Sequence, residues 1–406
     1  MKALFLPLCA STAAVCLAGT AAAQVVPVTL PTAELLEVRF CPADVAHPYP
    51  LDSLRGVQGL LLQNVAVINH GAPLSLEAVE IELLRAGEAI DSRLITGAAL
   101  DNAISGAQAA KAQGLFEMFA FQVCDGALIN GASLGDDTTL ETGEALVVMQ
   151  QPFAWKGTRD EIRVSARGLR GVEPVAGRGT IRLDATTSQT TFRFPLRSGT
   201  WLVAAGASFH TTHRWAVPEE FALDIIRLGP DLKSHSGTGE AHTDFHAYGA
   251  EVVAAADGTV IEVITGGQEG PPMLRRPDET MEVYYGRVGV QQAENMAGGL
   301  PGIIGEGVII DHGNSEYSVY AHLIPGSAAV REGQTVKAGD TIGRLGSSGN
   351  STEAHLHFQV CDAPSALSCA GIVPTFVDLE IANTDGPRPL QSGDLVIIAP
   401  QQTTAD

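Results

Sequence analysis

A pair of histidines separated by one residue is the strongest local indication of chemistry in this sequence. His355 and His357 flank Leu356, and Phe358 follows them. In a β-strand, side chains two residues apart point to the same face, so both imidazoles project together while Leu356 and Phe358 face the core. Two imidazoles on one strand face can supply a metal ligand and a neighbouring catalytic group. An H-x-H pair also occurs in structural roles, so it predicts a site only together with further residues.

Two more polar residues occur in apolar, strand-like stretches upstream of this pair. In residues 317–323 the alternation places Tyr320 and His322 on one face, and Asp224 lies inside the apolar run 221–226. A buried carboxylate without a partner costs on the order of several kcal/mol, so it needs a cation, a set of donors or a metal. We therefore expect Asp224 to belong to a site; an aspartate that caps a turn is the alternative.

These motifs and their order resemble those of the lysostaphin/LytM zinc metallopeptidases, a family of peptidoglycan endopeptidases. The resemblance extends over about residues 190–385 and is most specific at residues 320–323 and 355–357. The other matching stretches are a first hairpin, a pair of glycine-marked hairpins and the loop before the H-x-H strand, at residues 248–260, 330–343 and 346–351.

The resemblance implies a role for each of these residues. His357 and Asp224 become zinc ligands, and His322 and His355 become catalytic histidines that do not bind the metal. A catalytic zinc ion takes three protein ligands and leaves a position for water, whose pKa it lowers. One histidine would then accept a proton, and the other would stabilise the oxyanion or protonate the leaving amine. We expect one Zn²⁺ per chain.

The third zinc ligand departs from the family pattern. The family places a histidine four residues before the aspartate, where this chain has Glu220. We predict His213 instead, eleven residues before Asp224, because a loop containing Pro218 can return it to the metal. Glu220 and His210 are the alternatives.

The elements that must position these residues are predicted to be strands. The fold class is all-β, with an N-terminal β-sandwich followed by a LytM-like antiparallel β-sheet peptidase domain. In the C-terminal half, strand patterns punctuated by glycine lie at residues 251–256, 258–265, 307–311, 318–322, 339–346 and 355–360.

The N-terminal half predicts a small antiparallel sandwich. Residues 79–83 alternate as a half-buried strand does, and the alanine-rich residues 97–113 predict a helix. In the other half, an inserted loop at residues 266–302, with a short helix near 281–296, is expected to gate the groove. Further strand patterns of the sandwich lie at residues 60–67, 115–124, 145–150 and 161–166.

The N-terminus predicts an export signal. Lys2 precedes an apolar stretch at residues 3–17, and small residues at 21–23 offer a cleavage site. The stretch is shorter than the roughly 20 residues of a membrane span, so we expect the protein in the periplasm or outside the cell. Residues 167–179, rich in glycine and arginine, predict a linker. The predicted segments are a signal peptide (1–23), a sandwich-like accessory domain (24–175), a LytM-like metallopeptidase domain (180–390) and a C-terminal tail (391–406).

Charge and cysteine content agree with export. The formal charge of −21 becomes −22 when Lys2 leaves with the signal, which disfavours nucleic acid as a partner, and no membrane insertion is expected. Cys9 and Cys16 also leave with the signal. The remaining four are predicted to form disulfides in an oxidising compartment. Of three pairings we favour Cys41 with Cys124 and Cys361 with Cys369.

The predicted function is an exported zinc metalloendopeptidase that hydrolyses peptide cross-links of peptidoglycan, with a regulatory protein as a second partner. The first alternative is a non-catalytic wall-binding relative that activates another hydrolase, which the altered first motif favours. A second alternative is a biotinyl/lipoyl-type carrier, because the glycine-marked hairpins resemble those sheets and Lys337 lies near a hairpin tip.

Overall fold

The computed structural model describes most of the chain beyond residue 35. The predicted signal peptide lies outside the described residues. Residues from Leu35 onward group as one unit. Within the described part, no helix is long and apolar enough to cross a membrane. The described residues are 36–399 without 53–54, 119, 186, 198, 209–210, 212, 383 and 385–387.

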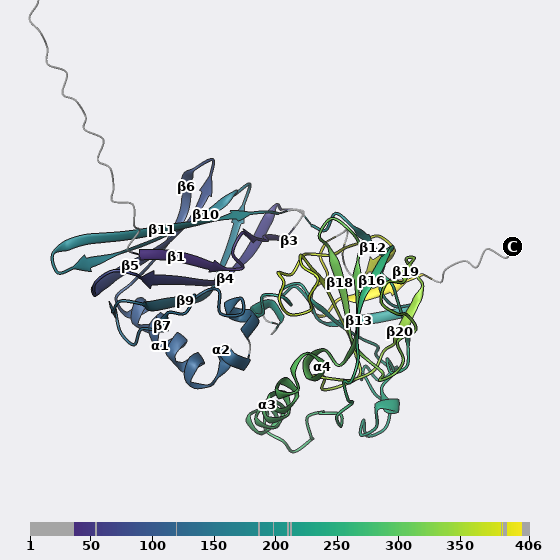
Figure 1. The fold of residues 1–406 in the computed structure, drawn as a ribbon. Coiled ribbons are helices and arrows are strands. Elements are labelled where there is room, and N and C mark those ends of the chain that lie inside the picture. Colours follow the sequence, from purple (N-terminus) through teal and green to yellow (C-terminus); the bar gives the residue numbers. More distant parts are fainter. Residues whose placement is uncertain are drawn as a thin grey trace, which may run out of the picture. The chain divides into compact units, whose positions relative to one another are not determined.

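Two sheets form the N-terminal part, as the sequence predicts (Figure 1). One core cluster takes buried side chains from both sheets, among them Leu60 and Val65 from one and Ile81 and Val164 from the other, so the sheets pack as a sandwich. The first sheet holds β1 (Leu36–Cys41), β3 (Tyr49–Asp52), β4 (Val57–Asn69), β7 (Ser133–Leu134) and β9 (Glu144–Lys156). The second holds β2 (Val45–Ala46), β5 (Leu74–Arg85), β6 (Glu88–Thr96), β8 (Thr139–Leu140), β10 (Glu161–Arg170) and β11 (Glu173–Leu183).

The linker predicted at residues 167–179 is wrong, because these residues belong to the hairpin of β10 and β11. The glycines there permit close packing of the backbone. A Cβ atom on Gly168 would lie 2.2 Å from the carbonyl oxygen of Ser75, and one on Gly177 would lie 2.2 Å from that of Leu36. Glycine in a strand is typical of such close approach.

The strand predicted at residues 115–124 is also wrong, whereas the predicted helix is confirmed as α1 (Ala98–Ala112). The segment forms the short helix α2 (Leu115–Met118) and the 3-10 helix η1 (Ala120–Val123). Phe121 and Val123 are buried there, and a disulfide joins Cys124 to Cys41 as predicted. Helical turns bury these apolar residues beside the disulfide without a strand partner.

A nine-stranded antiparallel sheet is the centre of the C-terminal part (Figure 1). Leu356, Phe358 and Tyr320 pack on one face with the largest core cluster. In order across the sheet, its strands are β19 (Thr335–Val336), β16 (Gly258–Ile264), β17 (Glu306–Asp311), β18 (Tyr317–Leu323), β21 (Leu356–Cys361), β14 (Leu223–Ile226), β13 (Gly199–Ala205), β24 (Leu395–Ile398) and β23 (Leu379–Ile381).

Strand β24 falls inside the predicted C-terminal tail, so residues 395–398 are part of the sheet instead. Val396 and Ile398 are buried on its inner face, which explains why this short segment pairs with β13. Two small sheets complete this part: β12 (Thr191–Phe192) with β22 (Thr375–Phe376), and β15 (Glu251–Val253) with β20 (Thr341–Arg344).

The insertion between β16 and β17 contains the predicted helix, α3 (Met281–Ala297), followed by α4 (Gly299–Ile304). The Thr280 hydroxyl caps α3 by accepting a hydrogen bond from the amide of Val283. Arg287 on α3 forms an ion pair with Glu279 at 2.8 Å. Two further 3-10 helices, η2 (His213–Trp215) and η3 (His242–Asp244), lie in the loops of this part.

Candidate metal centre

Asp224 and His357 are direct cross-strand neighbours. Strand β14 pairs antiparallel with β21, and Asp224 lies opposite His357 in the register. Opposed residues in such a pair project on the same face, so the two side chains must meet. The Nδ1 atom of His357 lies 3.2 Å from Oδ1 of Asp224, and Nε2 of His355 lies 3.3 Å from the same oxygen. The two histidines predicted to share a face therefore converge on one carboxylate.

His213 completes this group from a different kind of element. It opens η2, and its Nε2 atom lies 3.4 Å from Oδ2 of Asp224. One ligand atom from each of His213, Asp224 and His357 lies within 4.8 Å of the other two. Two imidazole nitrogens and one carboxylate oxygen match the donor set of a catalytic zinc site, which uses three protein ligands. The residues present therefore fit a zinc ion.

Three glutamines of the sandwich hold η2 by its backbone carbonyls. Gln63 on β4 donates to the carbonyl of Arg214 at 3.1 Å. Gln122 on η1 and Gln150 on β9 both donate to the carbonyl of Trp215, at 2.5 and 2.8 Å. These carbonyls directly follow His213 in the chain, so the hydrogen bonds set the position of the third candidate ligand.

Backbone geometry supports a special role for Gln150. Its φ of 52° is left-handed, and the pairing of β4 with β9 skips both Gln63 and Gln150. A non-glycine residue in this conformation costs roughly 1–3 kcal/mol and persists where surrounding contacts impose it. Here the local irregularity directs two amide side chains toward η2.

Glu220, one alternative for the third ligand, has another partner. Its Oε1 atom lies 3.0 Å from Nη1 of Arg214, whose side chain is fully buried against the rings of Tyr49 and Phe221. Burial raises the pKa of Glu220 to about 7, and Arg214 opposes that shift. Glu220 thus forms an ion pair with Arg214 of η2 and is not among the three candidate ligands. The other alternative, His210, lies outside the described residues.

His322 and His355 flank the candidate ligands. Their ring centroids lie 4.7 Å apart, and that of His322 lies 5.7 Å from that of His357. The predicted shared face of Tyr320 and His322 is wrong, because Tyr320 packs in the core and His322 turns to the site. A φ of 60° at His322 breaks the alternation that the prediction assumed.

The hydrogen bonds of His322 and His355 indicate where their protons lie. Nδ1 of His322 is 2.7 Å from the carbonyl oxygen of Ser348, and Nδ1 of His355 is 2.8 Å from that of Glu353. A carbonyl oxygen only accepts, so both Nδ1 atoms carry hydrogen. Neutral His322 then has its lone pair on Nε2. Nε2 of His355 faces Asp224.

The charges around Asp224 are strongly coupled. Burial would raise its pKa, but His213 and His355 and the hydrogen bonds from His355 and His357 hold it well below its usual range. Burial opposes the charged form of His357, yet Asp224 raises its pKa to about 9. Burial, together with His355 and His357, holds the pKa of His322 well below the ordinary value. His322 is therefore neutral at neutral pH.

One cavity of about 530 Å³ is lined by all five candidate site residues: His213, Asp224, His322, His355 and His357. This volume lies within the range of ligand-binding pockets, roughly 300–1,000 Å³. Its wall includes Gln292 and Met296 from α3, so part of the inserted segment contributes to it. The sandwich contributes Asn64, Phe116, Phe121, Gln122, Met149 and Gln150.

Sequence reasoning missed the residues that support the site. Gln359, two residues after His357, was detectable from the strand period, since it must share the face of His357. The carbonyl of Ser348 and the glutamines that hold η2 carry no sequence signal, because glutamine is common and its partners lie on distant segments.

Comparison with known proteins agrees with the predicted family. The family model described as peptidase family M23 matches residues 283–368, which include His322, His355 and His357. The match is to residues 283–368, so this part of the chain resembles peptidase family M23.

Solved structures similar to this chain include three from bacteria. The catalytic domain of lysostaphin from Staphylococcus simulans is 16% identical, with 43% of this chain and 88% of that chain covered and a TM-score of 0.23. LytM from Ruminococcus gnavus is 21% identical, with coverages of 37% and 42% and a TM-score of 0.20. Csd3 from Helicobacter pylori is 14% identical, with coverages of 76% and 68% and a TM-score of 0.23.

Proposed function

We propose that this protein is an exported zinc metalloendopeptidase that hydrolyses the peptide cross-links of bacterial peptidoglycan. The observation that carries the proposal is the meeting of His213, Asp224 and His357 beside two further histidines in one cavity. The match to peptidase family M23 supports the reaction class. The two disulfides fit an oxidising compartment outside the cytoplasm.

His213, Asp224 and His357 would hold the zinc ion. When bound, zinc lowers the pKa of a water molecule and polarises the scissile carbonyl. Asp224 is ionised and lies among three imidazoles, so its charge favours a cation at this point. The cavity lined by these residues and by His322 and His355 would hold the substrate.

We assign the proton-transfer role to His322. Its Nδ1 proton is held by the carbonyl of Ser348, so Nε2 is free to accept a proton from the attacking water. Its lowered pKa keeps it neutral and ready for this role. After the peptide bond breaks, the same Nε2 returns the proton to the leaving amine.

We assign stabilisation of the oxyanion to His355. Its Nδ1 proton is held by the carbonyl of Glu353, and Asp224 raises its pKa against the effect of burial. His355 can thus carry a proton on Nε2 and donate it toward the negative charge that develops on the carbonyl oxygen.

Digestion of purified sacculi tests the proposal. The wild-type protein with zinc should release soluble muropeptides, and His322→Ala should release far fewer while binding zinc equally well. Loss of one general base costs roughly 10²–10⁴-fold in rate. Binding of sacculi without release of muropeptides would contradict the proposal and favour a wall-binding relative that activates another hydrolase.

A further inference from the structure

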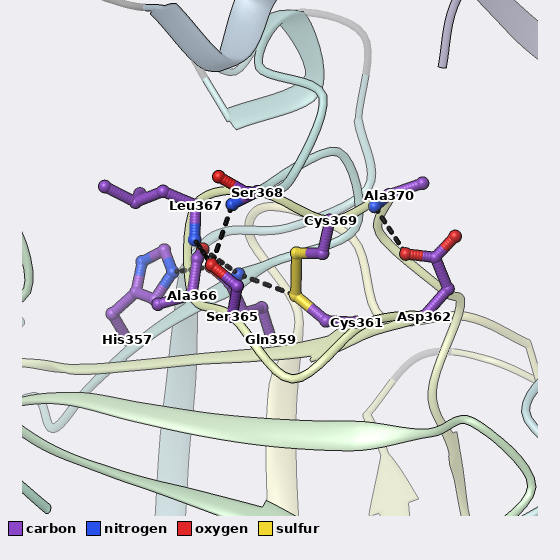
Figure 2. Close-up of a disulfide and its surroundings, with 10 residues drawn as sticks. All are labelled: His357, Gln359, Cys361, Asp362, Ser365, Ala366, Leu367, Ser368, Cys369 and Ala370. Atoms are coloured by element: carbon purple, nitrogen blue, oxygen red, sulfur yellow. Dashed lines mark hydrogen bonds between the residues drawn. A yellow bond between two sulfur atoms is a disulfide. The ribbon is translucent and has the colours of Figure 1, made fainter. Parts of the chain in front are cut away.

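Gln359 is a buried amide that contacts His357 on the side away from Asp224. Only 1% of its surface is exposed. Oε1 of Gln359 lies 2.8 Å from Nε2 of His357 (Figure 2). Nδ1 of the same ring lies 3.2 Å from Oδ1 of Asp224. The two ring nitrogens of His357 thus face two different partners. Nδ1 can bind a metal only when the ring proton is on Nε2.

The other end of the Gln359 amide fixes which way it points. Its Nε2 donates to the carbonyl oxygen of Ala366 at 2.9 Å and to Sγ of Cys361 at 3.2 Å (Figure 2). A carbonyl oxygen only accepts, so the NH₂ group must face Ala366 and Oε1 must face His357. A reversed amide would place its NH₂ group against the Nε2–H of His357 and its oxygen against the carbonyl oxygen of Ala366.

The loop that carries Ala366 is closed by a disulfide. Cys361 is bonded to Cys369, as the sequence predicts. Within the loop, the Ser365 hydroxyl accepts from the amides of Leu367 and Ser368, at 3.3 and 3.0 Å. Ala366 is 1% exposed. The carbonyl oxygen of Ala366 therefore has a fixed position, and its hydrogen bond fixes the orientation of the Gln359 amide.

We propose that Gln359 is a positioning residue that keeps the proton of His357 on Nε2 and its Nδ1 lone pair toward the metal, with the disulfide-closed loop fixing the amide. This inference rests on the proposed function. Partners on the far ring nitrogen of a metal-binding histidine orient the ring and select its tautomer, and their loss typically costs about 10- to 100-fold in metal affinity.

Two substitutions of Gln359 distinguish an effect on the orientation of the His357 ring from an effect on packing alone. Gln359→Met keeps the length of the side chain but neither accepts from His357 nor donates to Ala366, so zinc affinity should fall about 10- to 100-fold. Gln359→Glu still accepts from Nε2 of His357 but cannot donate to the loop. Compared with Gln359→Met, this variant should bind zinc with an affinity closer to the wild-type value. Its thermal stability should stay below that of the wild type.

Zinc affinity is measured by competition with a chromophoric chelator near neutral pH, using folded protein verified by circular dichroism. The matched control is Gln108→Met on α1, which removes two hydrogen bonds to the carbonyls of Leu134 and Gly135. Long-range ¹H–¹⁵N NMR of histidine-labelled protein reports the tautomer. The wild type should show His357 bound through Nδ1 with a proton on Nε2.

The outcomes distinguish this inference from the proposed function. Weaker zinc binding and a changed His357 signature in Gln359→Met, with Gln108→Met unchanged, would support the positioning role. A Gln359→Met protein with wild-type affinity and an unchanged signature overturns that role alone. A wild-type protein that takes up no zinc overturns the proposed function, and the positioning role with it.

Discussion

Two regions bring candidate ligands to the same point by different physical means. Asp224 and His357 stand opposite each other on paired strands, where the backbone ladder fixes their separation. His213 stands on the three-residue helix η2, whose carbonyls are held by side chains of the sandwich. The first arrangement depends on local register, and the second depends on contacts with residues far away in the sequence.

Each half of the chain contributes a different part of the candidate site. The sheet alone supplies the carboxylate of Asp224, one candidate ligand histidine, His357, and the neighbouring His355. The third candidate ligand, His213, lies on η2, where Gln122 and Gln150 of the sandwich both donate to the carbonyl of Trp215. The N-terminal part is therefore a structural support of the site as well as part of the cavity wall.

The largest expected effect comes from the strand side. Asp224→Ala removes the carboxylate that three imidazoles surround, so we expect loss of stoichiometric zinc and no measurable digestion of sacculi. Metal analysis after dialysis and muropeptide release measure the two effects. Asp257→Ala is the matched control, because Asp257 is an exposed partner of Lys337. Full zinc content in Asp224→Ala would show that the strands do not carry the site.

An intermediate effect is expected when η2 loses its support. The double variant Gln122→Ala, Gln150→Ala removes both donors to Trp215 but leaves Asp224 and His357 in register. Zinc affinity should fall about 10-fold, by analogy with other losses in the outer shell of metal sites. Chelator competition measures it, with Gln108→Ala as the control. An unchanged affinity would mean that η2 holds His213 without the sandwich.

The smallest effect on the candidate site itself is expected from Glu220, whose titration should make the stability of the fold depend on pH. Glu220 has its pKa raised from 4.5 to about 7, since burial opposes its charge. Between these values the folded chain binds more protons than the unfolded chain, so the free energy of unfolding should decrease as pH rises. The slope is at most about 1.4 kcal/mol per pH unit.

Chemical denaturation of wild type and Glu220→Gln across this pH range measures that contribution. The variant should lack the decrease, whereas Glu251→Gln, which alters a more exposed ion pair with Arg197, should retain it. Identical pH profiles for wild type and Glu220→Gln would show that the buried pair with Arg214 does not respond to pH.

The strand side of the site could be predicted from the sequence because it follows simple periodicity. His355 and His357 share a face by the two-residue repeat, and an aspartate inside an apolar run indicates a partner. His322 was found by its motif, but its orientation was not, because its φ of 60° breaks the strand pattern. A single backbone angle of this kind leaves no trace in residue type.

The support of η2 could not be predicted, since it depends on tertiary contacts between common residue types. Gln63, Gln122 and Gln150 come from three separate elements, and only folding brings them together. The false linker at residues 167–179 has a similar cause. Glycine serves flexible linkers and tightly packed strands alike, and the sequence does not distinguish the two uses.

We propose that His213 is the third zinc ligand, in place of the histidine that the family pattern puts at the position of Glu220. The direct test is the zinc content of the mature protein and of His213→Ala after exhaustive dialysis. We predict about one zinc per wild-type chain, as a three-ligand catalytic site requires, and its loss in the variant. Zinc retained by His213→Ala at the wild-type level would show that His213 is not the third ligand.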